Sequence, residues 1–233
     1  MPDPATRQSD DVLELWQLSF YFAIVIAVIV FGLLLYSVIR HRHRNDDLPK
    51  QTEGNVPLEL VYTVIPFILV GILFAYGLKA QDVNTELVKS PDLRVDVTGY
   101  QWNWRFSYPS EGIGIESGRQ ELGANDETLS TLVLPVNQRV RLSLVASDVN
   151  HSFFVPNFLT KRDLIPGIRN EIEVTPKTIG MFPGHCAEFC GLNHAQMNFR
   201  VQVVSEADYA AWVGSKQAAQ AESTPVEKGS APT

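Results

Sequence analysis

The hydrophobic pattern divides the chain into an apolar N-terminal part and an alternating C-terminal part. No charged side chain occurs from Leu15 to Ile39 or from Leu60 to Leu78. A membrane-spanning helix needs roughly 20 apolar residues at about 1.5 Å each, so the first run is long enough and the second is near the minimum. Pro66 and Gly71 lie in the second run, and membrane helices tolerate both residue types. The pattern predicts a transmembrane hairpin over residues 15–78.

The residues before the first apolar run decide between a retained helix and a secretory signal peptide. A signal peptide has a basic start and a shorter apolar core. Here the preceding segment carries Asp10, Asp11 and Glu14. We therefore expect a true span, with residues 1–14 forming an external N-terminal segment.

The link between the two runs predicts the orientation of the hairpin. It begins Arg40-His41-Arg42-His43-Arg44. Under the positive-inside rule, a short basic loop of this kind lies in the cytoplasm. Residues 40–58 are therefore expected to be cytoplasmic, and everything after Lys79 is expected to be external, beginning with a linker over 79–91.

Residues 92–204 show the two-residue alternation that is typical of half-buried β-strands. Val140-Arg141-Leu142-Ser143-Leu144 is one such run, and turn residues such as Pro166-Gly167 separate the runs. This pattern predicts an antiparallel β-sandwich, and periodicity alone leaves open whether it is immunoglobulin-like or cupredoxin-like. Residues 205–233 are expected to form a short helix and then a disordered tail, because the end of the chain is rich in Ala, Gln, Ser and Pro.

Composition and histidine positions exclude several functions. The chain has 233 residues and a formal net charge of −7, so a phosphate-binding surface for nucleic acid is not expected. None of its histidines lies in a predicted span, so this chain holds no axial ligand for a haem within the membrane. No Cys-x-x-Cys-His occurs, so no covalently attached haem is expected either. The five histidines are His41, His43, His151, His185 and His194.

The candidate chemistry lies in one twelve-residue segment and one histidine upstream of it. Two thiolates, an imidazole and a thioether suit copper, which favours soft sulfur ligands combined with imidazole. From spacing alone, three alternatives stay open: a disulfide, a structural Cys2His2 zinc site, and a buried thiol pair. The residues concerned are Cys186, Cys190, His194 and Met197, with His151 upstream.

The segment resembles the dinuclear copper (CuA) signature of cytochrome c oxidase subunit II. The pattern Cys-x-Glu-x-Cys-Gly-x-x-His-x-x-Met runs from 186 to 197, and Asp-x-x-His-Ser occupies 148–152. The resemblance extends over roughly residues 15–204. It includes Leu58-Glu59 before the second span and the aromatic stretch from Gly99 to Trp104. It implies a bacterial cell-membrane protein in which a two-helix hairpin precedes a cupredoxin-like sandwich.

The resemblance also implies a ligand set. Two copper ions would share the sulfurs of both cysteines. One ion would gain His151 and Met197, and the other would gain His194 and the backbone carbonyl of Glu188. The side chain of Glu188 would reach a magnesium ion shared with the catalytic subunit. His185 matches no ligand position.

The implied function is that of the electron-accepting subunit of a proton-translocating terminal oxidase that reduces O2 to water. Its partners would be the haem–copper subunit I, subunit III, membrane lipid, and cytochrome c or a membrane-bound cytochrome c as donor. Trp102 would accept the electron, and Glu59 would mark the mouth of a proton channel. Asn103 stands where the family often has an aromatic residue. If residues 100–106 form one strand, then Tyr100, Trp102, Trp104 and Phe106 share a face.

Two other functions and one surface remain to be weighed. A membrane-anchored copper carrier would need an exposed, exchangeable site. The copper domain of a nitrous oxide reductase is not expected, because a chain of this length leaves no room for a second catalytic domain. Between residues 111 and 127, five acids face one arginine, which either steers a basic cytochrome or forms a solvated loop. These residues are Glu111, Glu116, Arg119, Glu121, Asp126 and Glu127.

Overall fold

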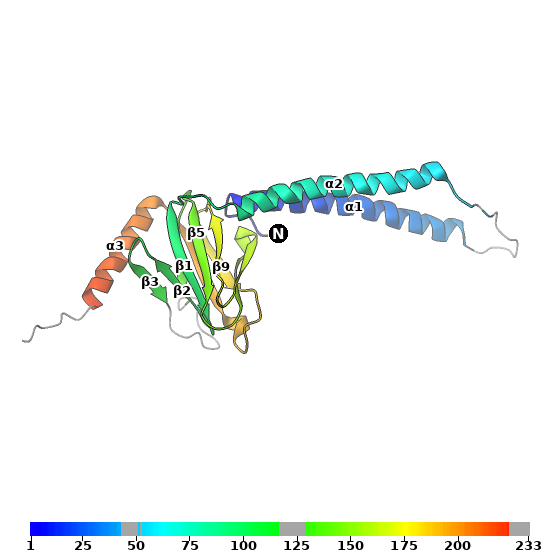
Figure 1. Ribbon diagram of the computed structural model, residues 1–233. Coiled ribbons are helices and arrows are strands. Elements are labelled where there is room, and N and C mark those ends of the chain that lie inside the picture. Colours follow the sequence, from blue (N-terminus) through cyan, green and yellow to red (C-terminus); the bar gives the residue numbers. More distant parts are fainter. Residues whose placement is uncertain (43–50, 52, 117–128, 224–233) are drawn as a thin grey trace, which may run out of the picture. The chain divides into compact units, whose positions relative to one another are not determined.

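The computed structural model describes residues 1–42, 51, 53–116 and 129–223. Contacts divide the chain into two units. One unit, Asp11–Asp82, carries most of two long helices, and the other consists of Met1–Asp10 together with the chain from Val83 onward. Figure 1 shows the helices and the strands of these units.

The helical unit contains helix α1 (Gln8–Arg40) and helix α2 (Val56–Thr85). Both are long and apolar enough to cross a membrane, and the most apolar stretch of each buries no residue within the structure. Both helices extend beyond the uncharged runs, because polar residues continue the helical backbone at their ends. At one end of the hairpin, Lys79 Nζ lies 2.9 Å from an Asp11 carboxylate oxygen and 3.3 Å from one of Glu14.

Within the described residues, the second unit is a sandwich of two five-stranded sheets, in the orders β3-β2-β1-β5-β8 and β4-β10-β9-β6-β7. The prediction of a purely antiparallel sandwich was wrong, because β1 pairs with β5 and β4 with β10 in parallel. Alternation identifies a strand and its buried face but carries no information about its partner. The strands are β1 (Leu93–Tyr100), β2 (Asn103–Tyr108), β3 (Ile113–Glu116), β4 (Thr131–Pro135), β5 (Val140–Ala146), β6 (His151–Val155), β7 (Thr160–Leu164), β8 (Asn170–Val174), β9 (Gly180–Cys186) and β10 (Asn198–Val204).

Helical turns complete the second unit. Short 3-10 helices η2 (Pro156–Phe158) and η3 (His194–Gln196) lie between strands. Helix α3 (Glu206–Ser223) follows β10, and its Trp212 ring packs 5.0 Å from that of Tyr108. This helix is longer than the short one that the sequence predicted, and residues 224–233 of the expected tail lie outside the described residues.

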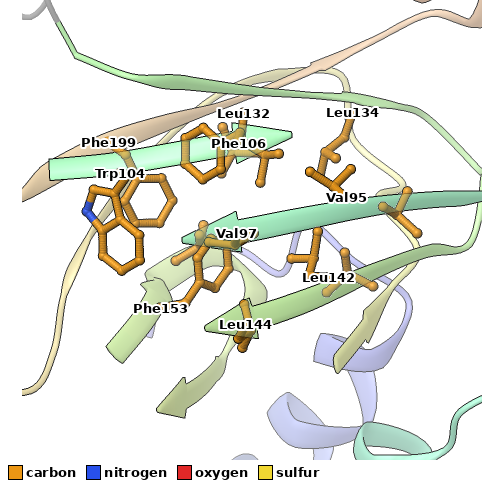
Figure 2. Packing of buried hydrophobic residues seen from close by; sticks show 14 of the residues in the cluster. Val95, Val97, Trp104, Phe106, Leu132, Leu134, Leu142, Leu144, Phe153 and Phe199 are labelled. Atoms are coloured by element: carbon orange, nitrogen blue, oxygen red, sulfur yellow. The ribbon is translucent and has the colours of Figure 1, made fainter. Parts of the chain in front are cut away.

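The core lies between the sheets, where alternate residues of facing strands meet (Figure 2). The Phe153 and Phe199 rings of one sheet stack at 4.9 Å, and the Trp104 ring of the other lies 5.0 Å from Phe199. Each such buried side chain contributes about 1.5–3 kcal/mol relative to an exposed one. Figure 2 labels Val95, Val97, Trp104, Phe106, Leu132, Leu134, Leu142, Leu144, Phe153 and Phe199.

The N-terminal segment belongs to the sandwich unit, which the sequence did not predict. Ala5 and Thr6 are buried, and Ala5 N donates to the Asn157 carbonyl at 2.8 Å. Thr6 Oγ1 accepts from Ser9 N at 3.2 Å and Ser9 Oγ accepts from Thr6 N at 3.1 Å, so these two side chains cap the start of α1. Lys177 N donates to the Ala5 carbonyl at 2.9 Å, which joins the segment to the chain after β8.

A buried carboxylate fastens the segment after α2. The Glu173 side chain is fully buried and forms ion pairs with Arg139 and Arg141. It also accepts from Val88 N at 3.1 Å, while Arg141 donates to the Val88 carbonyl. Helix α2 continues into the expected linker as far as Thr85. The backbone of Val88, further along the linker, is hydrogen-bonded to side chains of β5 and β8.

Candidate metal centre

Strand pairing brings the candidate ligands together. Cys186 ends β9, the loop that follows carries the other cysteine and the later ligands, and β10 returns antiparallel beside β9. On the other edge of β9 lies β6, with Phe153 opposite Cys186. This register places His151, the first residue of β6, beside a loop 35 positions later in the chain.

The two cysteines are free and buried, and their sulfurs lie 3.8 Å apart. A disulfide would need about 2.05 Å, so the disulfide alternative does not describe this geometry. Cys186 Sγ lies 3.9 Å from His151 Nδ1 and 3.2 Å from the Glu188 carbonyl oxygen. Cys190 Sγ lies 3.6 Å from His194 Nδ1 and 3.7 Å from Met197 Sδ.

The structure thus brings all six ligand groups implied by the resemblance into one small volume. The ligand atoms of His151, Cys186 and Cys190 lie within 4.8 Å of one another. His151 and Met197 are fully buried, and the two cysteines are nearly so. Thiolate, thioether and imidazole form a soft donor set that fits copper. Tetrahedral zinc sites are built from thiolate, imidazole and carboxylate ligands and do not include a thioether.

The two thiols have different acidities without a cation. Burial opposes ionisation of Cys186, but the hydrogen bonds with the His151 imidazole, with the backbone at Glu188 and Ser152 and with His194 together outweigh it and lower the pKa of this thiol. Burial and the negative charge on Cys186 raise the pKa of Cys190. A cation beside both sulfurs would favour the thiolate form of both.

Asp148 sets the orientation of the His151 ring. Its Oδ1 lies 2.8 Å from His151 Nε2, which leaves Nδ1 facing the sulfurs. Burial raises the pKa of Asp148, but the hydrogen bond with His151 and those from the Gln101 and Val149 amides lower it overall. In many metal sites, a carboxylate accepts a hydrogen bond from the histidine ring nitrogen that does not bind the metal, and this bond fixes the orientation of the ring. The Asp-x-x-His spacing in the sequence was the only signal of this role.

The aromatic stretch is a hairpin and not one strand, so the condition for a face shared by all four aromatic residues is not met, and only Trp104 and Phe106 share the buried face of β2. β1 and β2 join through a two-residue turn, Gln101-Trp102, with Tyr100 opposite Asn103. Trp104 is in the core, whereas Tyr100 lies on the outer face, where its hydroxyl donates to a Glu116 carboxylate oxygen at 2.5 Å. Alternation assumes a continuous strand, and the turn reverses the chain.

Trp102 lies in this turn, partly exposed, and its Nε1 donates to the Cys190 carbonyl at 3.0 Å. Asn103, the residue after Trp102, is buried. Trp104 has a role that the sequence did not show. Its Nε1 donates to the Met197 carbonyl at 3.3 Å, and its ring centre lies 6.4 Å from that of His151.

The remaining predicted residues lie outside this pocket. The half-exposed Glu188 carboxylate lies 3.5 Å from Lys161 Nζ, which also binds Asp163 at 2.8 Å. Glu59 is in the first turn of α2, where it accepts from Asn55 N at 3.2 Å. His185 packs edge-on against Phe154 at 5.0 Å.

Only part of the acidic stretch can be placed. Glu111 is partly exposed, and Glu116 forms an ion pair with Arg105 at 2.6 Å. Arg119, Glu121, Asp126 and Glu127 lie outside the described residues, as do residues 43–50 and 52 of the expected cytoplasmic loop.

Two helices apolar enough to span a membrane and a β-sandwich whose pocket gathers soft ligands are the features expected of a membrane-anchored, cupredoxin-like protein with a metal site. The family model described as cytochrome C oxidase subunit II, periplasmic domain, matches residues 93–204. The model of the transmembrane domain of that subunit matches residues 1–80.

Curated relatives agree with these matches. Over 90% of its length, the chain is 36% identical to a probable cytochrome c oxidase subunit 2 of Streptomyces avermitilis, of which it covers 76%. Over 91% of its length, it is 34% identical to cytochrome c oxidase subunit 2 of Mycobacterium tuberculosis, of which it covers 73%. The chain therefore belongs to the cytochrome c oxidase subunit 2 family, which confirms the resemblance, and its relatives are subunits of a terminal oxidase.

Solved structures include a similar domain. The periplasmic domain of subunit II from Bradyrhizobium japonicum is 33% identical, with 57% of this chain and 99% of that chain covered and a TM-score of 0.49. A second structure, a mixed disulfide between a thioredoxin-like protein and such a subunit, is 31% identical and also has a TM-score of 0.49.

The pocket predicts how metal binding responds to single substitutions. Cys186→Ser is expected to abolish binding of copper to the full chain, because a hydroxyl is a hard and poorly ionised substitute for a thiolate. Met197→Leu is expected to retain the metal with an altered spectrum, since both thiolates remain. Metal content by mass spectrometry is the measurement, with Met181→Leu on exposed β9 surface as control. Full copper content in Cys186→Ser would contradict this ligand assignment.

Proposed function

We propose that this chain is the electron-accepting subunit of a proton-translocating cytochrome c oxidase. It takes electrons from cytochrome c at a dinuclear copper centre and delivers them to the haem centres of subunit I, where O2 is reduced to water. One observation carries the proposal: two free, buried thiols 3.8 Å apart, each with an imidazole nitrogen within 4 Å. When bound, two copper ions held by Cys186, Cys190, His151, His194, Met197 and the Glu188 carbonyl would accept and release one electron at a time.

The protein framework supports this chemistry by holding the ligands still. His151 is fixed by strand β6 and by Asp148, while Cys186 is fixed by the end of β9. Met197 is fully buried, and its carbonyl accepts from the amide of Cys186 at 3.0 Å. Rigid ligands reduce the rearrangement that accompanies each change in charge. The weak neutral ligands, a thioether and the Glu188 carbonyl, would help to set the potential.

Burial favours electron transfer over the copper-carrier alternative. A carrier must release its ion to a partner, which requires an accessible site. Here His151 and Met197 are fully buried, and Cys186 and Cys190 are 4% and 3% exposed. Only Glu188 and His194 of the proposed ligand residues are partly exposed. A soft metal bound in such a pocket would exchange slowly.

The assembly and location are proposed from the same family membership. In the isolated chain, apolar side chains of α1 and α2 are exposed along the helices, as expected of a hairpin that contacts lipid and other membrane subunits. We propose subunits I and III as those partners. The membrane is the bacterial cell membrane, with the basic segment from Arg40 on the cytoplasmic side and the sandwich outside.

Trp102 is the proposed electron entrance, since its partly exposed ring is hydrogen-bonded to the backbone carbonyl of Cys190, one of the proposed copper ligands. Trp102→Gln is expected to slow transfer from cytochrome c to copper by about 100-fold or more, because the route loses its aromatic step. Copper content and donor affinity should stay near wild type. Stopped-flow reduction of the copper centre measures the rate, with Trp212→Phe on α3 as control. An unchanged rate would remove Trp102 from the route.

Glu188 is the proposed magnesium ligand, through a carboxylate that the copper site leaves free. Lys161 and Asp163 lie beside it, so the carboxylate is part of a charged cluster. This cluster is at the edge of the loop between β9 and β10, residues 187–197, which we call the copper loop. Glu188→Gln keeps the backbone carbonyl and should leave the copper spectrum unchanged while weakening Mg²⁺ or Mn²⁺ binding. Mn²⁺ EPR of the assembled oxidase is the measurement, with Glu171→Gln on β8 as control. A wild-type Mn²⁺ signal in Glu188→Gln would count against this role.

Glu59 is the proposed mouth of a proton channel at the cytoplasmic end of α2. Glu59→Gln should slow steady-state turnover by about tenfold. This effect on the rate is smaller than the one expected from removing a proton donor that acts directly at a reacting atom. The copper spectrum and cytochrome binding should not change. Turnover is measured from pH 6 to pH 9 by oxygen uptake, a range that spans about three decades of proton concentration. Glu53→Gln serves as control, and wild-type rates throughout would refute the role.

A further inference from the structure

The turn that carries Trp102 is bound to the copper loop by two side chains and not by one. Gln101 Nε2 donates to the Cys190 carbonyl at 2.8 Å, and Trp102 Nε1 donates to the same oxygen at 3.0 Å. A carbonyl oxygen has two lone pairs, so both bonds can form together. The carbonyl that accepts them belongs to one of the two cysteines whose sulfurs face each other in the pocket.

The turn is also held from its other side. Gln101 N donates to Asp148 Oδ2 at 2.7 Å, while Asp148 Oδ1 lies 2.8 Å from His151 Nε2. Gln101 is therefore bonded through its backbone to the carboxylate that orients one ligand, and through its side chain to the loop that carries the others.

Close packing leaves little freedom where the turn meets the loop. A Cβ atom on Gly191 would lie 3.2 Å from Gln101 Nε2 and 3.3 Å from Trp102 Cζ2. Gly191 also has φ +112°, a conformation that side chains other than glycine rarely adopt. The loop thus presents bare backbone to the Gln101 amide and the Trp102 indole, and these two groups cover it.

We propose that Gln101 is a positioning residue for electron transfer, whose side-chain amide holds the Trp102 indole on the Cys190 carbonyl. The inference rests on the proposed function and adds a residue to it. A partly exposed indole N–H can exchange its protein acceptor for water at little cost. A second bond from the adjacent residue to the same oxygen keeps the turn in place when that exchange occurs. Without it, the ring would spend part of its time away from the loop.

The test compares variants of the assembled oxidase. Gln101→Met keeps the length of the side chain and removes the donor, and Gln101→Glu keeps its shape and places a carboxylate against the carbonyl. Both should lower the first-order rate from bound cytochrome c to copper by roughly ten- to a hundredfold, as small misplacements of reacting groups do. Gln101→Lys restores a donor and should recover most of the rate. Gln202→Met on β10 is the matched control.

A second measurement follows the ring itself. Hydroxyl-radical footprinting with mass spectrometry reports oxidation of Trp102 in the intact complex, and it should rise in Gln101→Met and Gln101→Glu while that of buried Trp104 stays constant. A rate effect without greater Trp102 labelling would overturn the positioning role, because the amide would then act in another way. Wild-type rate and labelling in both variants would overturn it as well.

The same series separates this inference from the proposed function. If Trp102→Gln slows transfer and Gln101→Met does not, the entrance at Trp102 stands and the role of Gln101 falls. If Trp102→Gln transfers at the wild-type rate, the entrance at Trp102 falls, and Gln101 then has no indole to position for transfer.

Discussion

The pairing of β6 with β9 is the constraint on which the site depends. Phe153 lies opposite Cys186 in this pair, so His151, two residues earlier, reaches the start of the loop between β9 and β10. A one-residue slip of β6 would turn the His151 ring to the other face of the sheet. The register is held by burial, because Phe153 stacks on Phe199 in the core while the imidazole enters the pocket. The hydrophobic core and the ligand geometry are therefore specified by the same strand pair.

Trp104 couples the second sheet to this pocket. It belongs to β2, yet its indole N–H donates to the Met197 carbonyl and its ring packs on Phe199 of β10. Gln101 and Trp102, from the turn before β2, bind the Cys190 carbonyl of the same loop. The loop between β9 and β10 is thus held at Cys190 and at Met197 by one hairpin of the opposite sheet. This arrangement combines a rigid ligand set with an aromatic side chain that reaches the surface.

The membrane hairpin poses a different physical problem from the sandwich. Its helices bury nothing in their most apolar stretches, so their stability as helices comes from backbone hydrogen bonds and from a surrounding that is itself apolar. The sandwich satisfies its own core and uses polar bonds at its margins instead. Ala5 binds Asn157 and Lys177, and Glu173 binds two arginines and the amide of Val88. Both chain segments that border the hairpin are therefore fastened to the sandwich unit.

Local features of this protein were determined by the sequence alone. The uncharged runs from Leu15 and Leu60 identify two helices, because a run of about twenty apolar residues has the length and composition of a membrane-spanning helix. The segment from Cys186 to Met197 identifies the ligand types, because a short loop places its own residues close together. Only the tertiary structure decided what depends on distant pairing: the parallel partners of β1 and β4, the packing of residues 1–10 on the sandwich, and the approach of His151 to Cys186. It also decided that residues 100–106 turn back at Gln101-Trp102, which places one tryptophan on the loop between β9 and β10 and the next in the core. Alternation along a chain records which side of a strand is buried, whereas partner, register and turn geometry are set by contacts between residues far apart in sequence.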